Sequence, residues 1–168
     1  MLGANSSENT IDLRRKTIRV METVVLGSTG IKVNKNGFGA LPIQRVSTED
    51  AVKLARKAYE AGITFFDTAR FYTDSEEKLG EAFDGMREKV YIATKTAAKN
   101  ADEFWEQLGI SLHNLRTDYI DIYQFHNPSF CPKPGDGTGL YEAMLEAKAQ
   151  GKIRHIGITN HRLAVAEE

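Results

Sequence analysis

Short apolar segments alternate with longer amphipathic segments along most of the chain, and this alternation constrains the fold more than any other feature. Segments of four to seven residues rich in β-branched and aromatic side chains predict strands, and the segments of ten to fifteen residues between them predict helices. Repeated strand–helix–strand units form a parallel sheet with helices packed on it. The sequence therefore predicts a single α/β domain without a long internal linker.

The pattern predicts an antiparallel hairpin, then five parallel strands and four complete helices. The hairpin strands are residues 23–26 and 31–33, the sheet strands are residues 35–40, 63–66, 89–94, 119–125 and 152–158, and the helices are residues 48–61, 75–83, 101–115 and 140–149. A further helix is expected from residue 160 onward. Ser47 is the expected N-cap of the first helix and Gly62 its C-terminal stop. The prolines and glycines of residues 127–138 predict a long loop.

The first 20 residues differ from the rest, because they are polar and have no clear amphipathic period. We expect residues 1–20 to be a flexible N-terminal extension and residues 21–168 to form the folded domain. The alternative is a short helix or strand that docks on the domain.

Composition excludes several classes of partner. The chain has 22 Lys and Arg against 23 Asp and Glu, a formal net charge of −1, which gives no electrostatic reason to expect nucleic acid or an anionic membrane as partner. No apolar run is long enough to suggest a membrane span. Cys131 is the only cysteine, so we expect neither an intrachain disulfide nor a cysteine-based metal cluster, and no metal site is predicted. The cytoplasm is the simplest location.

Four polar residues, Asp67, Tyr72, Lys95 and His126, follow the ends of three successive predicted strands. Each alone has an ordinary structural explanation, such as capping a turn, packing or solvation. The carboxyl ends of parallel strands face one side of the sheet, so the four side chains are expected to converge there. Their joint occurrence favours an active site.

These four residue types suit the reduction of a carbonyl group. Hydride addition places negative charge on oxygen, so a proton donor is needed beside it. The phenol of Tyr72 can donate, although its reference pKa of about 10 is high for exchange near neutral pH. The ammonium of Lys95 would favour the phenolate and lower this pKa, Asp67 would pair with Lys95, and His126 would donate a hydrogen bond to the oxyanion.

Several segments resemble the aldo-keto reductase superfamily, in the order in which that family has them. They are LGSTGIKVNKNGFGA, FFDTARFYTDSEEKLGEAF, VYIATKTA, IDIYQFHNP and KIRHIGITNH. The resemblance covers the chain from about Thr23 to its end. It implies a (β/α)8 TIM barrel, with the hairpin at the barrel bottom, and NAD(P)H-dependent reduction of aldehydes or ketones.

The resemblance also implies roles for individual residues. Tyr72 would be the general acid, assisted by Asp67 and Lys95, and His126 would orient the carbonyl. The residues implied near the cofactor are Ala40, Leu41, Asp67, Thr159 and Asn160. Thr159 stands where serine is commoner in the family and keeps the hydroxyl. Family precedent favours NADPH, with NADH as the alternative. GFGAL lacks the third glycine of a Rossmann fingerprint, so no Rossmann site is expected.

The chain departs from the family in length. A closed barrel needs about 250 residues, and the five predicted strands make a partial barrel. In the family, the remaining strands carry the aromatic that stacks on the nicotinamide and the basic cluster for the adenosine 2′-phosphate. The segments PKPGDG and IRHIGITNHR are similar to a microbial branch whose longer members carry a C-terminal iron–sulfur segment.

Three readings follow. We expect the chain to be the front part of a longer reductase, so that its activity alone is doubtful. The first alternative is a non-catalytic, cofactor-sensing regulatory module. The second alternative is a half-barrel that associates with itself or with a complementary chain through its open edge.

Overall fold

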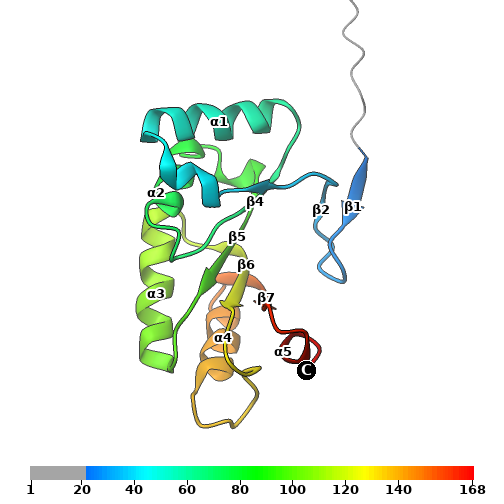
Figure 1. The fold of residues 1–168 in the computed structure, drawn as a ribbon, viewed down its shortest axis with the longest axis vertical. Coiled ribbons are helices and arrows are strands. Elements are labelled where there is room, and N and C mark those ends of the chain that lie inside the picture. Colours follow the sequence, from blue (N-terminus) through cyan, green and yellow to red (C-terminus); the bar gives the residue numbers. More distant parts are fainter. Residues whose placement is uncertain (1–21) are drawn as a thin grey trace, which may run out of the picture.

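The computed structural model describes residues 22–168, and the extension expected over residues 1–20 lies outside this range. Two separate sheets are present (Figure 1). Strand β1 (Thr23–Val25) pairs antiparallel with β2 (Lys32–Asn34). The second sheet has five parallel strands in the order β3-β4-β5-β6-β7. The predicted hairpin and the five-stranded parallel sheet are therefore confirmed.

Helices alternate with the strands of the larger sheet, as predicted. The strands are β3 (Phe38–Gly39), β4 (Phe65–Asp67), β5 (Tyr91–Thr96), β6 (Ile120–His126) and β7 (Ile153–Thr159). The helices are α1 (Thr48–Glu60), α2 (Ser75–Ala82), α3 (Ala101–Asn114), α4 (Leu140–Ala149) and α5 (Leu163–Ala166), with short 3₁₀ helices η1 (Leu41–Arg45) and η2 (Arg87–Lys89). The loop over residues 127–138 contains neither helix nor strand, as predicted.

Several boundaries differ from the prediction: the first sheet strand, expected over residues 35–40, is only Phe38–Gly39, and the strand expected from residue 63 begins at Phe65. The strand expected from residue 89 begins at Tyr91, because η2 occupies the preceding residues, and it continues to Thr96 through its pairing with β6. The helix expected from residue 160 begins only at Leu163. Its start is delayed because the Asn160 side-chain oxygen accepts a hydrogen bond from the Arg162 backbone N–H at 2.7 Å, which makes a local turn.

Local signals at the helix ends agree with the prediction for α1. The Ser47 hydroxyl accepts a hydrogen bond from the Asp50 backbone N–H at 3.1 Å, which satisfies one of the free amides of the first turn. Gly62, just beyond the helix, has a φ of 96°, a conformation that glycine adopts without a steric penalty. The Asn100 side chain caps α3 in the same way, accepting from the Glu103 N–H at 2.9 Å.

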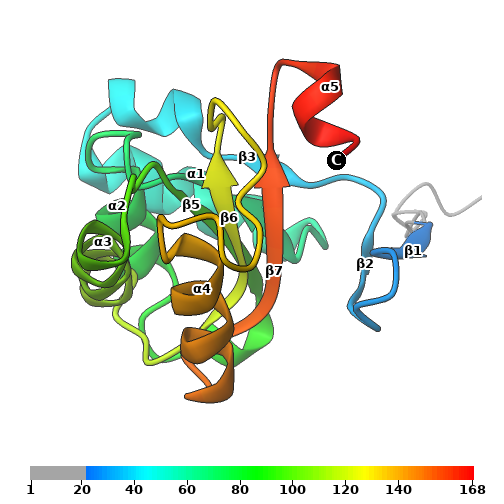
Figure 2. The same ribbon diagram turned by 90° about the horizontal axis from the view of Figure 1, so that it is seen from below.

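The main core lies between one face of the sheet and the helices. Alternate strand residues point to this face, among them Phe66, Ile92, Tyr123 and Phe125, and they are buried together with Leu79, Phe83, Phe104, Leu108 and Met144 of the helices. Figure 2 shows α1 to α4 gathered on this side of the sheet and the β1–β2 hairpin standing apart. Helices α1 to α4 therefore cover one face of the sheet.

The opposite face of the sheet is only half-buried. The strand residues on this face alternate with the core residues and keep part of their surface exposed, as in Phe65, Tyr91, Ile122 and His155. The sheet ends at β3 and β7, so the five strands do not close on themselves (Figure 1). Within residues 22–168, the outer edge of β7 has no strand partner. Among the helices of these residues, none is long and apolar enough to cross a membrane.

Helix α2 approaches the end of α3 closely at Gly80. A Cβ built on Gly80 would lie 2.1 Å from the Asn114 carbonyl oxygen and 2.9 Å from two backbone atoms of Leu115. Real Cβ atoms do not approach backbone so closely, so any larger residue must push the two helices apart. This glycine therefore sets the spacing of α2 and α3.

We predict that Gly80→Ala lowers the free energy of unfolding by about 1–3 kcal/mol, the usual cost of overpacking. Gly109→Ala is the matched control, because Gly109 lies inside α3 with no atom within 4 Å of its added Cβ. That change should be neutral or stabilise by up to about 1 kcal/mol. Chemical denaturation measures both, and equal effects would contradict the proposed close approach.

Candidate functional site

The structure brings the four predicted residues together at the carboxyl end of the sheet. Asp67 is the last residue of β4, Lys95 the last but one of β5, and His126 the last of β6. Tyr72 lies in the loop between β4 and α2. All of them line one cavity of about 180 Å³, whose other lining residues are Asn127, Thr159, Asn160 and His161.

An ion pair between Lys95 and Asp67 joins the two neighbouring strands. The Lys95 Nζ lies 2.6 Å from Asp67 Oδ1 and 2.6 Å from the Thr68 carbonyl oxygen. Lys95 is buried, whereas Asp67 keeps part of its surface exposed. A buried ammonium is stable only when it is paired and hydrogen-bonded, and these two acceptors meet that requirement.

Tyr72 is half-buried and packs against His126 and Lys95. Its ring centre lies 5.8 Å from that of His126 at an interplanar angle of 83°, and 5.3 Å from the Lys95 Nζ. Burial raises the pKa of the Tyr72 phenol above its ordinary value, and the negative charge of Asp67 adds to this. The phenol is therefore protonated at neutral pH.

This pKa direction is opposite to the predicted one. The sequence predicts that Lys95 lowers the pKa of Tyr72. In the structure this pKa is raised instead, first by burial of the phenol and then by the negative charge of Asp67, while the Lys95 ammonium is bonded to Asp67 Oδ1 and to the Thr68 carbonyl oxygen. Tyr72 is thus held as a proton donor in this state of the protein.

His126 is held in its neutral form. Burial lowers its pKa, and the positive charge of Lys95 lowers it further, whereas Asp67 acts in the opposite direction. A neutral imidazole has one N–H, which can donate a hydrogen bond to an oxygen atom in the cavity.

Thr159 and Asn160 lie at the end of β7 on the wall of the same cavity. The Thr159 hydroxyl makes only a long hydrogen bond of 3.5 Å to the Phe125 carbonyl. The Asn160 amide donates to the Pro128 carbonyl at 2.7 Å, and its oxygen accepts from the Arg162 N–H. The Thr159 hydroxyl can bond the carboxamide of a nicotinamide directly. The Asn160 side chain can do so only after it exchanges its bonds to the Pro128 carbonyl and the Arg162 N–H.

Ala40 and Leu41 lie away from the cavity lining. Ala40 is fully buried, its N–H donates to the Asp67 carbonyl at 2.8 Å, and its carbonyl accepts from the Ser75 hydroxyl at 2.9 Å. Leu41 begins η1 and is exposed. The backbone of Ala40 thus supports Asp67, and Leu41 is the one of the two whose side chain is accessible.

Sequence reasoning missed Asn127 and His161, which also line the cavity. His161 follows the predicted pair Thr159 and Asn160, and its N–H donates to the Asn127 side chain at 3.3 Å. Asn127 has a φ of 50°, a left-handed conformation that asparagine tolerates better than most residues. An asparagine directly after a strand end was the available signal for this turn.

A larger, mainly apolar hollow of about 470 Å³ adjoins the cavity and shares His126 and Asn127 with it. Its walls come from the loop after β5 and from the first residues of the 127–138 loop. Phe130 lines this hollow and is 40% exposed.

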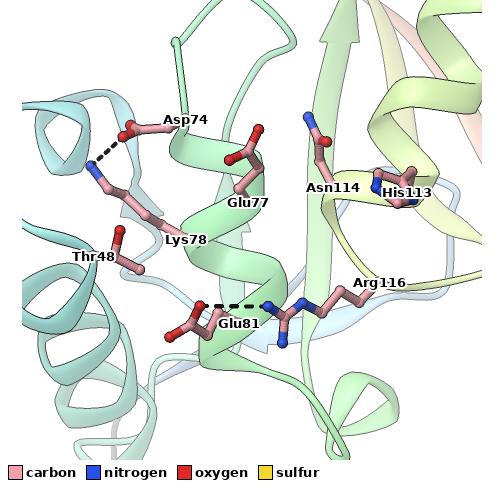
Figure 3. A pocket seen from close by; sticks show the side chains of 8 residues that line it. All are labelled: Thr48, Asp74, Glu77, Lys78, Glu81, His113, Asn114 and Arg116. Carbon is pink, nitrogen blue, oxygen red and sulfur yellow. Dashed lines mark hydrogen bonds and ion pairs between the residues drawn. The ribbon is translucent and has the colours of Figure 1, made fainter.

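A third hollow, of about 430 Å³, is lined by residues of α1, α2 and the end of α3 (Figure 3). Its lysine and arginine are paired within the structure. Lys78 bonds Asp74 at 2.8 Å and two carbonyls of the η1 region, and Arg116 pairs with Glu81 and Asp84. These charges hold α2 to its neighbours.

Among the described residues, no group of three or more His, Cys, Asp or Glu side chains is placed to hold a metal ion.

The surroundings of His126 give a testable titration. We predict an imidazole midpoint below the reference value of about 6.5, and a higher midpoint in Lys95→Met, because the repelling ammonium is gone and Asp67 then favours the imidazolium. Proton NMR follows this titration, with His126→Gln to assign the signal. Lys53→Met, which removes an exposed lysine of α1, is the charge-matched control. A midpoint unchanged by Lys95→Met would contradict the geometry.

Comparisons with known proteins identify the family. The model of the aldo/keto reductase family matches residues 31–168. The chain is 34% identical to an L-galactose dehydrogenase of Arabidopsis thaliana over 154 residues, which is 83% of this chain and 48% of the relative. It is 37% identical to a methylglyoxal reductase of Salmonella typhi over 132 residues, covering 74% and 48%.

Solved structures give the same result. An aldo-keto reductase from Bacillus halodurans in its holo form superposes with a TM-score of 0.78 at 29% identity, covering 88% of this chain and 53% of that one. One from Klebsiella pneumoniae in complex with NADPH has a TM-score of 0.75 at 29% identity, covering 87% and 52%. The chain thus spans about half the length of its relatives, and its open sheet is the corresponding part of their TIM barrel. The chain belongs to the aldo/keto reductase family.

Proposed function

We propose that the protein reduces aldehydes or ketones to alcohols with NAD(P)H, in the cavity formed by Asp67, Tyr72, Lys95 and His126. The observation that carries this proposal is the ion pair of the buried Lys95 with Asp67, beside a protonated phenol and a neutral imidazole. A proton donor, a charge that can stabilise its anion and a hydrogen-bond donor are the groups that carbonyl reduction needs.

Each side chain has a distinct part in this mechanism. The Tyr72 hydroxyl donates its proton to the carbonyl oxygen, and Lys95 stabilises the resulting phenolate because its Nζ lies 5.3 Å from the ring. Asp67 keeps the ammonium charged and aimed through the 2.6 Å bond. The neutral imidazole of His126 donates a hydrogen bond to the same carbonyl oxygen and orients it. The cofactor, when bound, supplies the hydride.

We propose NADPH as the cofactor, with NADH as the alternative, because a relative of this fold is known in complex with NADPH. The Thr159 hydroxyl and, after it leaves Pro128, the Asn160 amide would hold the nicotinamide carboxamide. Leu41 would lie near the cofactor at the rim of the cavity.

The single cysteine, Cys131, suits the cytoplasm, where we place the protein.

For the substrate, we propose a small carbonyl compound whose apolar part enters the hollow beside His126. The carbonyl itself must reach Tyr72 in the smaller cavity, and the two spaces share His126 and Asn127. Phe130 and Pro128 would then contact the part of the substrate that does not react.

We predict that Tyr72→Phe lowers carbonyl-dependent NADPH oxidation by about 10²- to 10⁴-fold, because it removes the proton donor. Affinity for NADPH should stay within about twofold of the parent, since the hydroxyl contributes to the chemical step rather than to cofactor binding. Tyr141→Phe removes a phenol outside the four-residue cavity and is the control. Retention of most turnover in Tyr72→Phe would rule out the assigned role, and cofactor binding without turnover in the parent would favour a cofactor-sensing module.

We further propose that the chain associates with a second copy through its open sheet. The outer edge of β7 lacks a strand partner among the described residues. The inner face of the sheet, which is the face opposite the helices and carries Phe65, Tyr91 and Ile122, is half-exposed. Exposed strand edges and apolar sheet faces favour pairing with another chain.

Light scattering of the purified chain should give a discrete mass about twice 18.7 kDa. Ile122→Lys places a charge on the inner face, so it should shift the species toward the monomer. A monomer at all concentrations would contradict the association, and a polydisperse aggregate would mean that the open edge has no specific partner in this chain.

A further inference from the structure

Glu76, in the first turn of α2, is a buried carboxylate that the proposed chemistry does not use. Its side chain is 1% exposed. It accepts a hydrogen bond from the Thr94 hydroxyl at 2.7 Å and one from the Asn114 amide at 3.4 Å, and it pairs with Arg70 at 3.5 Å. Burying a carboxylate is expensive unless such partners compensate it, so its position needs an explanation.

Two partners of Glu76 belong to the segments that carry Tyr72 and Lys95. Arg70 lies two residues before Tyr72 in the same loop, and its backbone N–H donates to the Lys95 carbonyl at 3.1 Å. Thr94 directly precedes Lys95 in β5. Glu76 therefore links the loop that carries Tyr72 to the strand that carries Lys95, from the helix side of the sheet.

The loop itself is strained next to Tyr72. Thr73 has a φ of 42°, a left-handed conformation that a β-branched residue rarely adopts. Such a residue persists only where the surrounding structure holds it in place. On its C-terminal side the Ser75 hydroxyl donates to the Ala40 carbonyl at 2.9 Å, and on its N-terminal side Glu76 holds Arg70.

We propose that Glu76 is a positioning residue for Tyr72. Through Arg70 and Thr94 it fixes the strained loop against β5, so that the phenol stays over the Lys95 ammonium and edge-on to His126. The assignment of this role to the reduction rests on the proposed function, whereas the effect on the position of Tyr72 does not.

Glu76→Gln is the discriminating variant, because it keeps a hydrogen-bond acceptor for Thr94 and removes the charge that holds Arg70. Glu77→Gln is the matched control, since Glu77 is the next residue, carries the same charge and is exposed. Arg70→Gln is the second variant and removes the other partner of the same ion pair. The Arg70 side chain is only partly buried, so this variant can fold even if the protein does not tolerate a change at the buried Glu76. Arg70→Lys keeps the charge and should behave like the parent.

The first measurement is NMR of the chain with ring-labelled tyrosine, with Tyr72→Phe to assign the signal. The nearby ring of His126 displaces the Tyr72 resonance from that of an exposed tyrosine. Glu76→Gln and Arg70→Gln should each move this resonance toward the exposed position, whereas Glu77→Gln and Arg70→Lys should leave it in place. An unchanged Tyr72 resonance in folded Glu76→Gln or, if that variant does not fold, in Arg70→Gln would overturn the proposal.

The second measurement is steady-state reduction. Glu76→Gln and Arg70→Gln should each lower kcat about ten- to a hundredfold, the usual effect of a small misplacement of a reacting group, with the KM for NADPH unchanged. A merely structural role would lower the melting temperature and leave kcat per folded molecule at the parent value, which would overturn the positioning role. Absence of turnover in the parent would instead contradict the proposed function, and the NMR result would still decide the position of Tyr72.

Discussion

The bond between Lys95 and Asp67 is the interaction on which the site depends. An ammonium buried at the end of β5 needs a carboxylate and a second acceptor, and it finds them in Asp67 of β4 and in the carbonyl of the next residue, Thr68. The parallel pairing of the two strands brings these groups within reach. The same pair acts on its neighbours, because the charge of Asp67 adds to the burial that raises the pKa of Tyr72, and the charge of Lys95 adds to the burial that lowers the pKa of His126. Burial and this contact together determine the protonation of the site.

Most of the fold could be predicted from the sequence, because the alternation of strand and helix is strong. The hairpin, the five parallel strands and the four main helices all lie where periodicity and capping residues such as Ser47 indicate. The boundaries that failed depend on individual contacts. The end of β5 is set by its pairing with the distant strand β6, and the delayed start of α5 is set by the local turn in which the Asn160 side chain accepts from the Arg162 N–H. Neither contact leaves a periodic signal.

The site was predictable in its members and less so in its energetics. Asp67, Tyr72, Lys95 and His126 follow strand ends, and parallel topology alone brings them to one cavity. The direction of the Tyr72 pKa could not be predicted, because it depends on how far the phenol is buried and on the nearby charge of Asp67. Glu76 was missed for a similar reason. In the sequence it is one of two adjacent glutamates in the first turn of a helix, and only the packing of α2 on β5 separates the buried one from the exposed one.

In the proposed reaction, the cofactor gives a hydride to the carbonyl carbon and Tyr72 gives a proton to the carbonyl oxygen. The most direct test is to incubate the purified chain with NADPH that carries deuterium at the transferable position of the nicotinamide, together with a small aldehyde. Mass spectrometry then locates the label in the alcohol product, with Lys95→Met as the control that should form little of it. Deuterium on the alcohol carbon in the parent is the predicted result. An alcohol without deuterium, or no alcohol from a chain that binds NADPH, would contradict the account.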